Sequence, residues 1–587
     1  MNHQDTAGPG RSAVSSSVLS LTVCWVFSIA SQNQLVAQSS NSERISVPIQ
    51  RLEESVKREL EQRTINGVSI ALVNDGKIIY SHGFGYANVD AKIMATPQTI
   101  YRAGSISKLF TAVAAMKLVE AGRLDLDAPL EKSNPKFHIC NPFDGLPPIT
   151  LRQLICHRSG MVREAPIGGY FDDQQPTLDT TLASIADCVL INPPDTKTRY
   201  SNVGPSIVGQ TVGMTSGQPF EQFVQEQIFD IVGMTSSSWI SNSAWADRSA
   251  AGYMRVARQD KTFERRRAPQ FELGTVPAGN LYTTVEDLAR FVTFLINQGQ
   301  YDGKQMLKAD TLAEMYRPQG SNEARTFGLG FSLGKFRDEG TVQHMGAVYG
   351  FTSSLVAIPG QKVGAIVLCN EDIAVGAVQR LMAAALAAVV DSRPEAGAGS
   401  TAGAVAPVGH DKFEPANLEV CVGSFESTSF WADIKVVDGH LYADISGQPM
   451  TLEQTGDYSF RANSAFLHDA QIVFQHDASG VVSGFTALRQ QFKRLDAQHL
   501  PEVPANWSKF VGAYGPAFIP LIVSIRNGHL YALAENEMDY RLTPMNRAVF
   551  RLPPGMYDDE QIVFQEGPDG KVNSLIMANF VLKRMGE

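Results

Sequence analysis

The stretch Gly104-Ser105-Ile106-Ser107-Lys108 places a hydroxyl and an amine three residues apart at the start of a predicted helix. Apolar residues recur after it near a 3.6-residue period, and Gly122 follows the last of them (Leu109, Phe110, Val113, Met116, Leu118 and Val119). Residues three apart share a helix face, so the Lys108 amine is predicted to overhang the Ser105 hydroxyl. An amine there can accept the serine proton, and the helix N-terminus favours the resulting alkoxide. Ser105 is therefore a candidate nucleophile.

Two alternatives compete with this interpretation. Serine often caps helices, so Ser105 has a purely structural reading as an N-cap. Gly330-Phe331-Ser332-Leu333-Gly334 matches the nucleophile elbow of α/β-hydrolases, which needs a strand before the serine and a helix after it. Residues 335–340 do not read as a helix, and a glycine-flanked strand is the better prediction for Ser332.

Two further short motifs follow Ser105 in order, Tyr200-Ser201-Asn202 and His344-Met345-Gly346. Together with Gly104 before the serine, this series resembles the serine β-lactamase and penicillin-binding-protein family, nearest its class C, esterase and D-aminopeptidase members. The likeness includes three longer segments and spans about residues 45–390 (149–161, 277–291 and 350–370).

The resemblance implies a catalytic domain over 41–390 of the α+β class, with an antiparallel sheet flanked by helices and an all-helical subdomain. It makes Ser105 the acylated nucleophile of a serine hydrolase, and Lys108 and Tyr200 a shared proton-transfer pair. Five further assignments follow from it: Asn202 contacts a substrate amide, His344 and Gly346 mark the strand along which the substrate lies, and the N–H groups of Ser105 and Ala347 form the oxyanion hole.

This chemistry makes a demand on Lys108, whose amine must be neutral near pH 7 although its ordinary pKa is about 10.4. Burial lowers the pKa of an amine, whereas a neighbouring tyrosinate raises it. Lys108 and Tyr200 are thus expected to titrate as a coupled pair, and the base is not assigned to either one.

The chain departs from the family pattern at the third motif, because it contains no Lys-Thr-Gly. His344 and Met345 take the places of the cation and hydroxyl that hold a substrate carboxylate, and neither replaces them well. Asn280 also stands where the family often has glycine. The departures favour a small ester, amide or D-amino-acid-containing peptide. A β-lactamase or DD-peptidase is the alternative enzyme, and a catalytically silent acylated sensor or binding protein is the alternative outside enzymes.

Charge and the absence of certain motifs exclude several kinds of molecule that the protein could bind. The 587-residue chain has a formal net charge of −10, which argues against nucleic-acid binding. It contains no metal-binding or phosphate-binding motif, so no metal and no cofactor is expected. A small-molecule or peptide substrate remains the expected partner.

Residues 1–40 read as a signal peptide, with Arg11 before an apolar run over 18–30 and small residues over 37–40. We therefore expect an exported protein, periplasmic or extracellular, without a stable membrane span after cleavage. An uncleaved anchor is the alternative.

The C-terminal part contains an internal repeat. Residues 391–411 are rich in Ala, Gly and Pro and predict a linker. Behind it, Val-Gly-Ser-Phe, Gly-His-Leu-Tyr and Ile-Val-Phe-Gln motifs recur after about 90 residues, dividing the rest into repeats over 412–498 and 505–587. Asp438-Gly439 and Asn527-Gly528 are hairpin signals, so each repeat is predicted to be a small antiparallel β-barrel.

Overall fold

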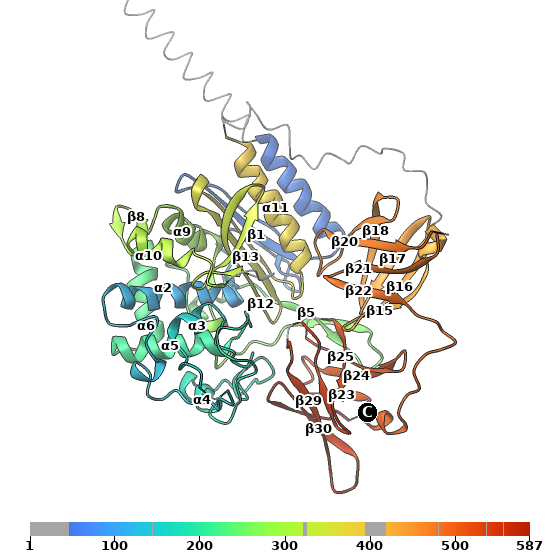
Figure 1. Ribbon diagram of the computed structural model, residues 1–587. Helices are drawn as coiled ribbons and strands as arrows, with labels where there is room; N and C mark the ends of the chain where they lie inside the picture. The colour runs from blue at the N-terminus through green and yellow to red at the C-terminus, as the bar shows by residue number, and fades with distance from the viewer. Residues whose placement is uncertain are drawn as a thin grey trace, which may run out of the picture.

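The structure, a computed structural model, describes residues 46–586 except 144, 321–325, 394–417, 479, 536 and 556. The predicted signal peptide lies outside these residues, as does the predicted linker beyond Arg393. The described chain forms a large helix-and-sheet part and two β parts on one side of it (Figure 1).

An eight-stranded antiparallel sheet organises the first part, in the order β10-β11-β12-β13-β14-β1-β2-β3. Its strands come from both ends of the predicted catalytic domain: β1 (Gly67–Asn74), β2 (Lys77–Asn88), β3 (Ile93–Met94), β10 (Thr326–Phe327), β11 (Ser332–Phe336), β12 (Glu339–Val348), β13 (Phe351–Ile358) and β14 (Val363–Cys369).

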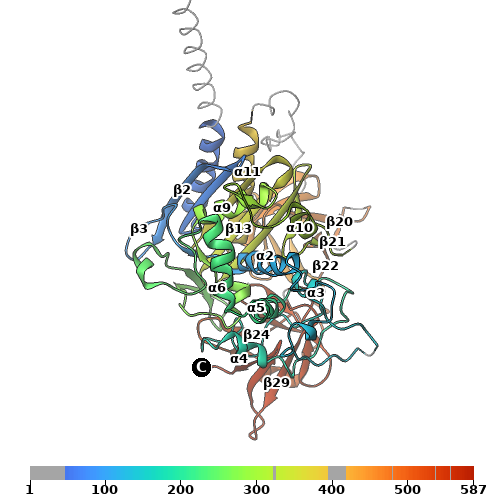
Figure 2. The same ribbon diagram turned by 90° about the vertical axis from the view of Figure 1, so that its left-hand side faces the viewer.

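Helices cover both faces of this sheet, and successive side chains of β1 are buried on opposite faces. Ile70 and Leu72 face the helix of residues 46–61 and α11 (Val375–Asp391), which lie side by side in Figures 1 and 2. Ala71 and Val73 join the core on the other face, which includes α9 (Val285–Ile296). Both faces are buried, so the central strands are apolar throughout.

The predicted helix after Ser105 is present. A 3₁₀ turn, η1 (Gly104–Ile106), leads into α2 (Ser107–Glu120), which is buried nearly all round because it lies between the sheet and the helical subdomain. The N-cap interpretation of Ser105 is wrong, since Ile106 occupies the cap position of α2 and no side chain caps it. Helices on this side of α2 in the described part of the chain include α3 (Leu151–Ile155), α4 (Leu178–Ala183), α5 (Val203–Ser216), α6 (Phe220–Val224) and α10 (Ala309–Met315).

Ser332 begins β11, which pairs with β10 and β12 and turns directly back into β12. No helix follows it, so this serine does not lie on a nucleophile elbow. The strand prediction for this segment is confirmed.

The first repeat is a closed antiparallel barrel, as predicted. Its eight strands are β15 (Gly423–Glu426), β16 (Trp431–Val437), β17 (His440–Ile445), β18 (Gln448–Gly456), β19 (Ser459–Asn463), β20 (Ala470–His476), β21 (Val482–Ala487) and β22 (Gln490–Arg494). Asp438 and Gly439 both have positive φ (50° and 78°), which the predicted tight hairpin turn requires.

The second repeat keeps the strand sequence but divides into two sheets. The long strand β18 of the first repeat has as its counterpart two short strands, β26 and β27, separated at Leu542. A single bridge between Tyr514 and Arg584 joins the outer strands. The strands are β23 (Gly512–Tyr514), β24 (Leu521–Arg526), β25 (His529–Leu533), β26 (Asp539–Arg541), β27 (Thr543–Pro544), β28 (Val549–Arg551), β29 (Gln561–Glu566), β30 (Val572–Met577) and β31 (Phe580–Lys583).

A hairpin of the first part, β5 (Tyr253–Ala257) and β6 (Phe263–Arg267), extends toward the β parts (Figure 1). Arg255 pairs with Glu537 at 3.2 Å, and Lys261 pairs with the buried Asp539 at 2.5 Å. These ion pairs fix the second repeat against the first part. Within the described ranges, no helix combines the length and apolar character that crossing a bilayer needs.

Candidate active site

Ser105 lies in η1, where this turn meets strand β12. Gly104 has φ of +52°, and a Cβ on it would lie 2.9 Å from the backbone nitrogen of Ala347. Only glycine suits this combination of left-handed backbone and close approach. The turn therefore holds Ser105 beside Ala347.

Lys108 makes three short contacts through its amine. Nζ lies 2.9 Å from Ser105 Oγ, 2.7 Å from Asn202 Oδ1 and 2.8 Å from the carbonyl oxygen of Ala278. A neutral amine has two N–H donors and one lone pair. As an ammonium, Nζ donates to all three oxygens; with Nζ still donating to Asn202 and Ala278, the lone pair of the neutral amine would face the Ser105 hydroxyl and could accept its proton.

The surroundings of Lys108 favour its neutral form. The residue is 2 % exposed, and burial holds the pKa of its amine well below the ordinary value. The Glu164 carboxylate opposes this effect and the Arg163 guanidinium adds to it. Desolvation dominates because it disfavours the ammonium directly.

Asn202 connects Lys108 to a buried carboxyl group that the motifs did not indicate. Its Nδ2 donates to Glu164 Oε1 while its Oδ1 faces Lys108. Burial raises the pKa of Glu164 to about 7, and the hydrogen bond from Asn202 and the charge of Arg163 limit the rise. Ser105, Lys108, Asn202 and Glu164 thus form one continuous chain of contacts.

Tyr200 flanks this chain. Lys108 Nζ lies 4.9 Å from its ring centroid, and the ring of His344 lies 6.2 Å away on the other side. His157 stacks on Tyr200 at 4.4 Å, and its Nδ1 accepts from the backbone N–H of Ser201 at 3.3 Å. His157 is therefore a positioning residue for the Tyr200 segment, consistent with its prediction as a loop histidine rather than a reactive one.

The third motif lies on an open strand edge. β12 pairs with β11 only as far as Gln343, so no described strand covers its outer edge from His344 to Val348. A Cβ on Gly346 would lie 2.0 Å from the carbonyl oxygen of Ala103, which is why η1 can approach. His344 Nδ1 lies 2.6 Å from the Met345 carbonyl oxygen, and Ala347 is exposed. The edge is available to an extended ligand.

Asn280, the departure from the family pattern, has a structural explanation. It is fully buried, and its amide exchanges two hydrogen bonds with the backbone of Leu273. This clamp holds α8 (Val276–Gly279), whose Ala278 carbonyl oxygen contacts Lys108.

The second repeat also reaches the site, which the sequence did not predict. Arg163 lies 5.5 Å from the ring centroids of both Tyr200 and Tyr557. The Tyr557 hydroxyl donates to Glu535 at 2.8 Å. These contacts join segments almost 400 residues apart, so no local signal could have found them.

A deeply buried ion pair lies just behind Tyr200. Arg199 and Glu560 are 3.3 Å apart with side chains only 3 % and 1 % exposed. Glu560 also accepts from the backbone N–H of Arg163 at 3.3 Å. The second repeat therefore fixes the chain on both sides of the Glu164–Asn202 contact.

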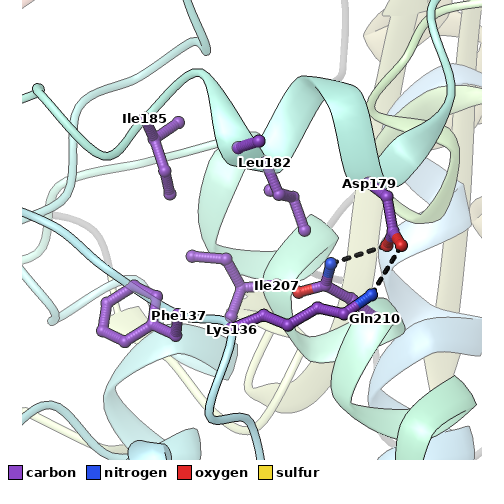
Figure 3. A pocket seen from close by; sticks show the side chains of 8 residues that line it. Lys136, Phe137, Asp179, Leu182, Ile185, Ile207 and Gln210 are labelled. Atoms are coloured by element: carbon purple, nitrogen blue, oxygen red, sulfur yellow. Dashed lines mark hydrogen bonds and ion pairs between the residues drawn. The ribbon is translucent and has the colours of Figure 1, made fainter.

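A cavity of about 360 Å³ occurs elsewhere, between α4 and α5 (Figure 3). An ion pair between Lys136 and Asp179 (2.8 Å) closes its rim, and Gln210 donates to Asp179. None of the predicted site residues lines it. Across the part of the chain that the structure describes, no three His, Cys, Asp or Glu side chains are grouped to hold a metal.

Three comparisons place the chain among known proteins. The family model described as Beta-lactamase matches residues 52–389. "Protein flp" of Staphylococcus aureus strain MRSA252 is 26 % identical over 321 residues, which cover 55 % of this chain and 62 % of that protein. "Beta-lactamase-like protein 2" of Dictyostelium discoideum is 28 % identical over 290 residues, covering 48 % and 50 %. The chain thus spans about half to three fifths of the length of these relatives.

A solved structure with the same fold is that of an octameric penicillin-binding protein homologue from Pyrococcus abyssi. Its TM-score is 0.53 at 24 % identity, and the match covers 76 % of this chain and 99 % of that one. At this identity the likeness concerns the fold alone.

Proposed function

The chain belongs to the Beta-lactamase family, and from this premise we propose that it is a serine hydrolase that forms an acyl-enzyme on Ser105. The observation that carries the proposal is the 2.9 Å contact between Ser105 Oγ and a buried Lys108 amine whose pKa lies well below its ordinary value. That contact supplies a serine with a base close enough to accept its proton.

In the proposed reaction Ser105 Oγ attacks the substrate carbonyl carbon while its proton passes to the Lys108–Tyr200 pair. A bond forms between Oγ and carbon, and the carbonyl oxygen becomes an oxyanion beside the N–H groups of Ser105 and Ala347. The bond from carbon to the leaving group then breaks, and the leaving group takes the proton from the pair. Water repeats these steps on the acyl-enzyme, which releases the acid and restores Ser105.

The substrate is proposed to lie along the open edge of β12. Asn202 would receive a substrate amide, and His344 and Gly346 would flank the bound chain. Without a lysine at the third motif, the edge lacks the fixed cation that grips a β-lactam carboxylate. A small ester, an amide or a D-amino-acid-containing peptide therefore suits the site better than a penicillin.

Export is part of the proposal, and it rests on the N-terminal sequence pattern alone. An exported hydrolase would meet small esters and peptides outside the cytoplasm. N-terminal sequencing of the protein secreted by its host cell tests this part, because removal of residues 1–40 would leave a chain that begins at residue 41.

A hydrolysis panel tests the enzyme proposal on the full chain. It contains 4-nitrophenyl acetate, D-alanine 4-nitroanilide, a D-Ala-D-Ala peptide and a chromogenic cephalosporin. Ser105→Ala should abolish every turnover, whereas Ser332→Ala, the matched serine on β11, should not. Preferred cephalosporin or D-Ala-D-Ala cleavage would favour a β-lactamase or DD-peptidase. Stoichiometric acylation without turnover would favour a sensor, and activity that survives Ser105→Ala would refute the proposal.

A further inference from the structure

Arg102 is a buried cation that the proposed mechanism does not use. It lies in β4 (Tyr101–Arg102), three residues before the nucleophile, and is 4 % exposed. Its Nε, Nη1 and Nη2 atoms have no hydrogen-bond partner among the described residues. Its guanidinium carbon lies 5.5 Å from the ring centroid of Tyr282.

None of the described groups around Arg102 forms a hydrogen bond or an ion pair with its guanidinium. Burial raises the pKa of Tyr170 and Tyr349 well above 10, so both phenols stay neutral. Asp372 acts on the same two phenols, and burial raises its own pKa to about 8, which leaves this carboxyl largely protonated at neutral pH. Glu272 accepts hydrogen bonds from Ser241 and Tyr282 at Oε1, and its Oε2 is buried without a hydrogen-bond partner among the described residues. Its carboxylate forms no ion pair with Arg102 within 4.0 Å.

A buried guanidinium without a hydrogen-bond partner lowers the stability of the folded protein. Arginine keeps its charge at any physiological pH, and a buried donor without an acceptor loses its hydration without replacement. Most such groups in folded proteins have a partner, and an exception calls for a missing ion, water or ligand. Five N–H donors in a planar fork match a carboxylate.

Arg102 is connected to the reaction site through Tyr349, which follows Ala347 by two residues. The charges of Arg102 and Glu164 both act on the pKa of this phenol, so Tyr349 lies near each of them. His344 precedes Ala347 on β12, and its ring centroid lies 6.2 Å from that of Tyr200. Because the leaving group takes its proton from the Lys108–Tyr200 pair, it lies toward Tyr200. The acyl group then extends toward Tyr349 and Arg102.

We propose that Arg102 binds a carboxylate carried by the acyl part of the substrate. The proposal rests on the acyl-enzyme reaction at Ser105 and narrows its substrates to acyl groups with a second, free acid, such as dicarboxylic acyl chains or acidic amino-acid residues. The third motif lacks the lysine that holds a carboxylate on the leaving-group side of the substrate. Arg102 would instead hold a carboxylate on the acyl side.

A pair of isosteric esters tests the proposal: the mono(4-nitrophenyl) ester of adipic acid and the same ester with its free acid converted to an amide. In the wild type, kcat/KM should favour the acid by at least about tenfold. Arg102→Met should lower this acid-to-amide ratio to about one, and Arg102→Lys should give an intermediate ratio. Arg267→Met, a change of an exposed arginine on β6, should leave the ratio unchanged.

An equal loss for both esters in Arg102→Met, or no preference in the wild type, would overturn the proposal and assign Arg102 a structural role. If the methionine variant does not fold, the lysine variant still reports the ratio.

Ligand binding separates this proposal from the reaction itself. Free adipate, compared with adipamide, should raise the melting temperature of Ser105→Ala but not of the double variant with Arg102→Met. A shift in Ser105→Ala together with absent ester turnover in the wild type would refute the acyl-enzyme and keep the carboxylate site. Turnover without any adipate-dependent shift would keep the acyl-enzyme and refute the carboxylate site.

Discussion

Replacing Gly346 by alanine tests whether the close approach of β12 to the nucleophile turn sets the acylation rate. A Cβ at this position would lie 2.0 Å from the Ala103 carbonyl oxygen and 2.4 Å from Ser353 Oγ. Those two atoms are hydrogen-bonded to each other at 2.8 Å and join the turn to the sheet. Contacts under 3.0 Å essentially do not occur for a Cβ, so the strand and the turn must separate by about 1 Å.

A displacement of that size acts directly on the proposed oxyanion hole, because the N–H groups of Ser105 and Ala347 lie on the two separating segments. A misplacement of about 1 Å costs about a hundredfold in rate, and loss of one donor costs about 10²–10³. We expect the acylation rate constant of Gly346→Ala to fall about a hundredfold. Overpacking of this kind also costs about 1–3 kcal/mol of stability.

The rate is measured as the burst of 4-nitrophenol from 4-nitrophenyl acetate in a stopped-flow experiment. Gly340→Ala is the matched control, since it lies on the same strand and an added Cβ there meets no atom within 4 Å. It should retain the wild-type burst. An acylation rate for Gly346→Ala within about threefold of the control would refute the reasoning, because the rate would then not depend on this approach.

Three further predictions follow from the site. Lys108→Ala and Tyr200→Phe should each slow acylation at least about a hundredfold, since each removes a member of the proton-transfer pair; a near-normal burst in either variant removes that residue from the mechanism. Burial raises the pKa of Glu164 from 4.5 to about 7, so the stability this carboxyl contributes is complete below pH 4.5 and is lost as the pH rises through 7. Glu164→Gln should therefore reduce the drop in melting temperature between pH 5 and pH 8, and an unchanged drop would contradict this. Glu560→Ala leaves Arg199 buried without its carboxylate and should cost about 3–5 kcal/mol in denaturant unfolding of the full chain; a cost under about 1 kcal/mol would show that the pair is not needed.

The parts of the molecule with local signals were predictable. The 3.6-residue period gave the helix after Ser105, and the turn residues Asp438-Gly439 and Asn527-Gly528 gave hairpins whose φ values are all positive. The contact of Lys108 with Ser105 followed from their spacing, because residues three apart share a helix face.

Other features depend on long-range packing and left no local pattern. Glu164 is an ordinary acid in the sequence and becomes unusual only where the fold buries it beside Asn202 and Arg163. The second repeat was expected to close like the first, and nothing in the residues around Leu542 marks the point where the strand divides. Arg102 is exceptional only because its neighbours leave it without a partner, which a sequence cannot show.

The contacts of the second repeat with the first part of the chain help to position the candidate active site. Glu560 holds the Arg199 side chain and the Arg163 backbone, which immediately precede Tyr200 and Glu164. Buried charges tolerate little misalignment, because each one that loses its partner keeps its desolvation cost. The interface therefore has one favourable arrangement, and that arrangement also sets where Tyr200 and Glu164 lie relative to Lys108. Joined in this way, the second repeat is a structural part of the candidate active site, even though it contributes no group to the proposed proton transfer.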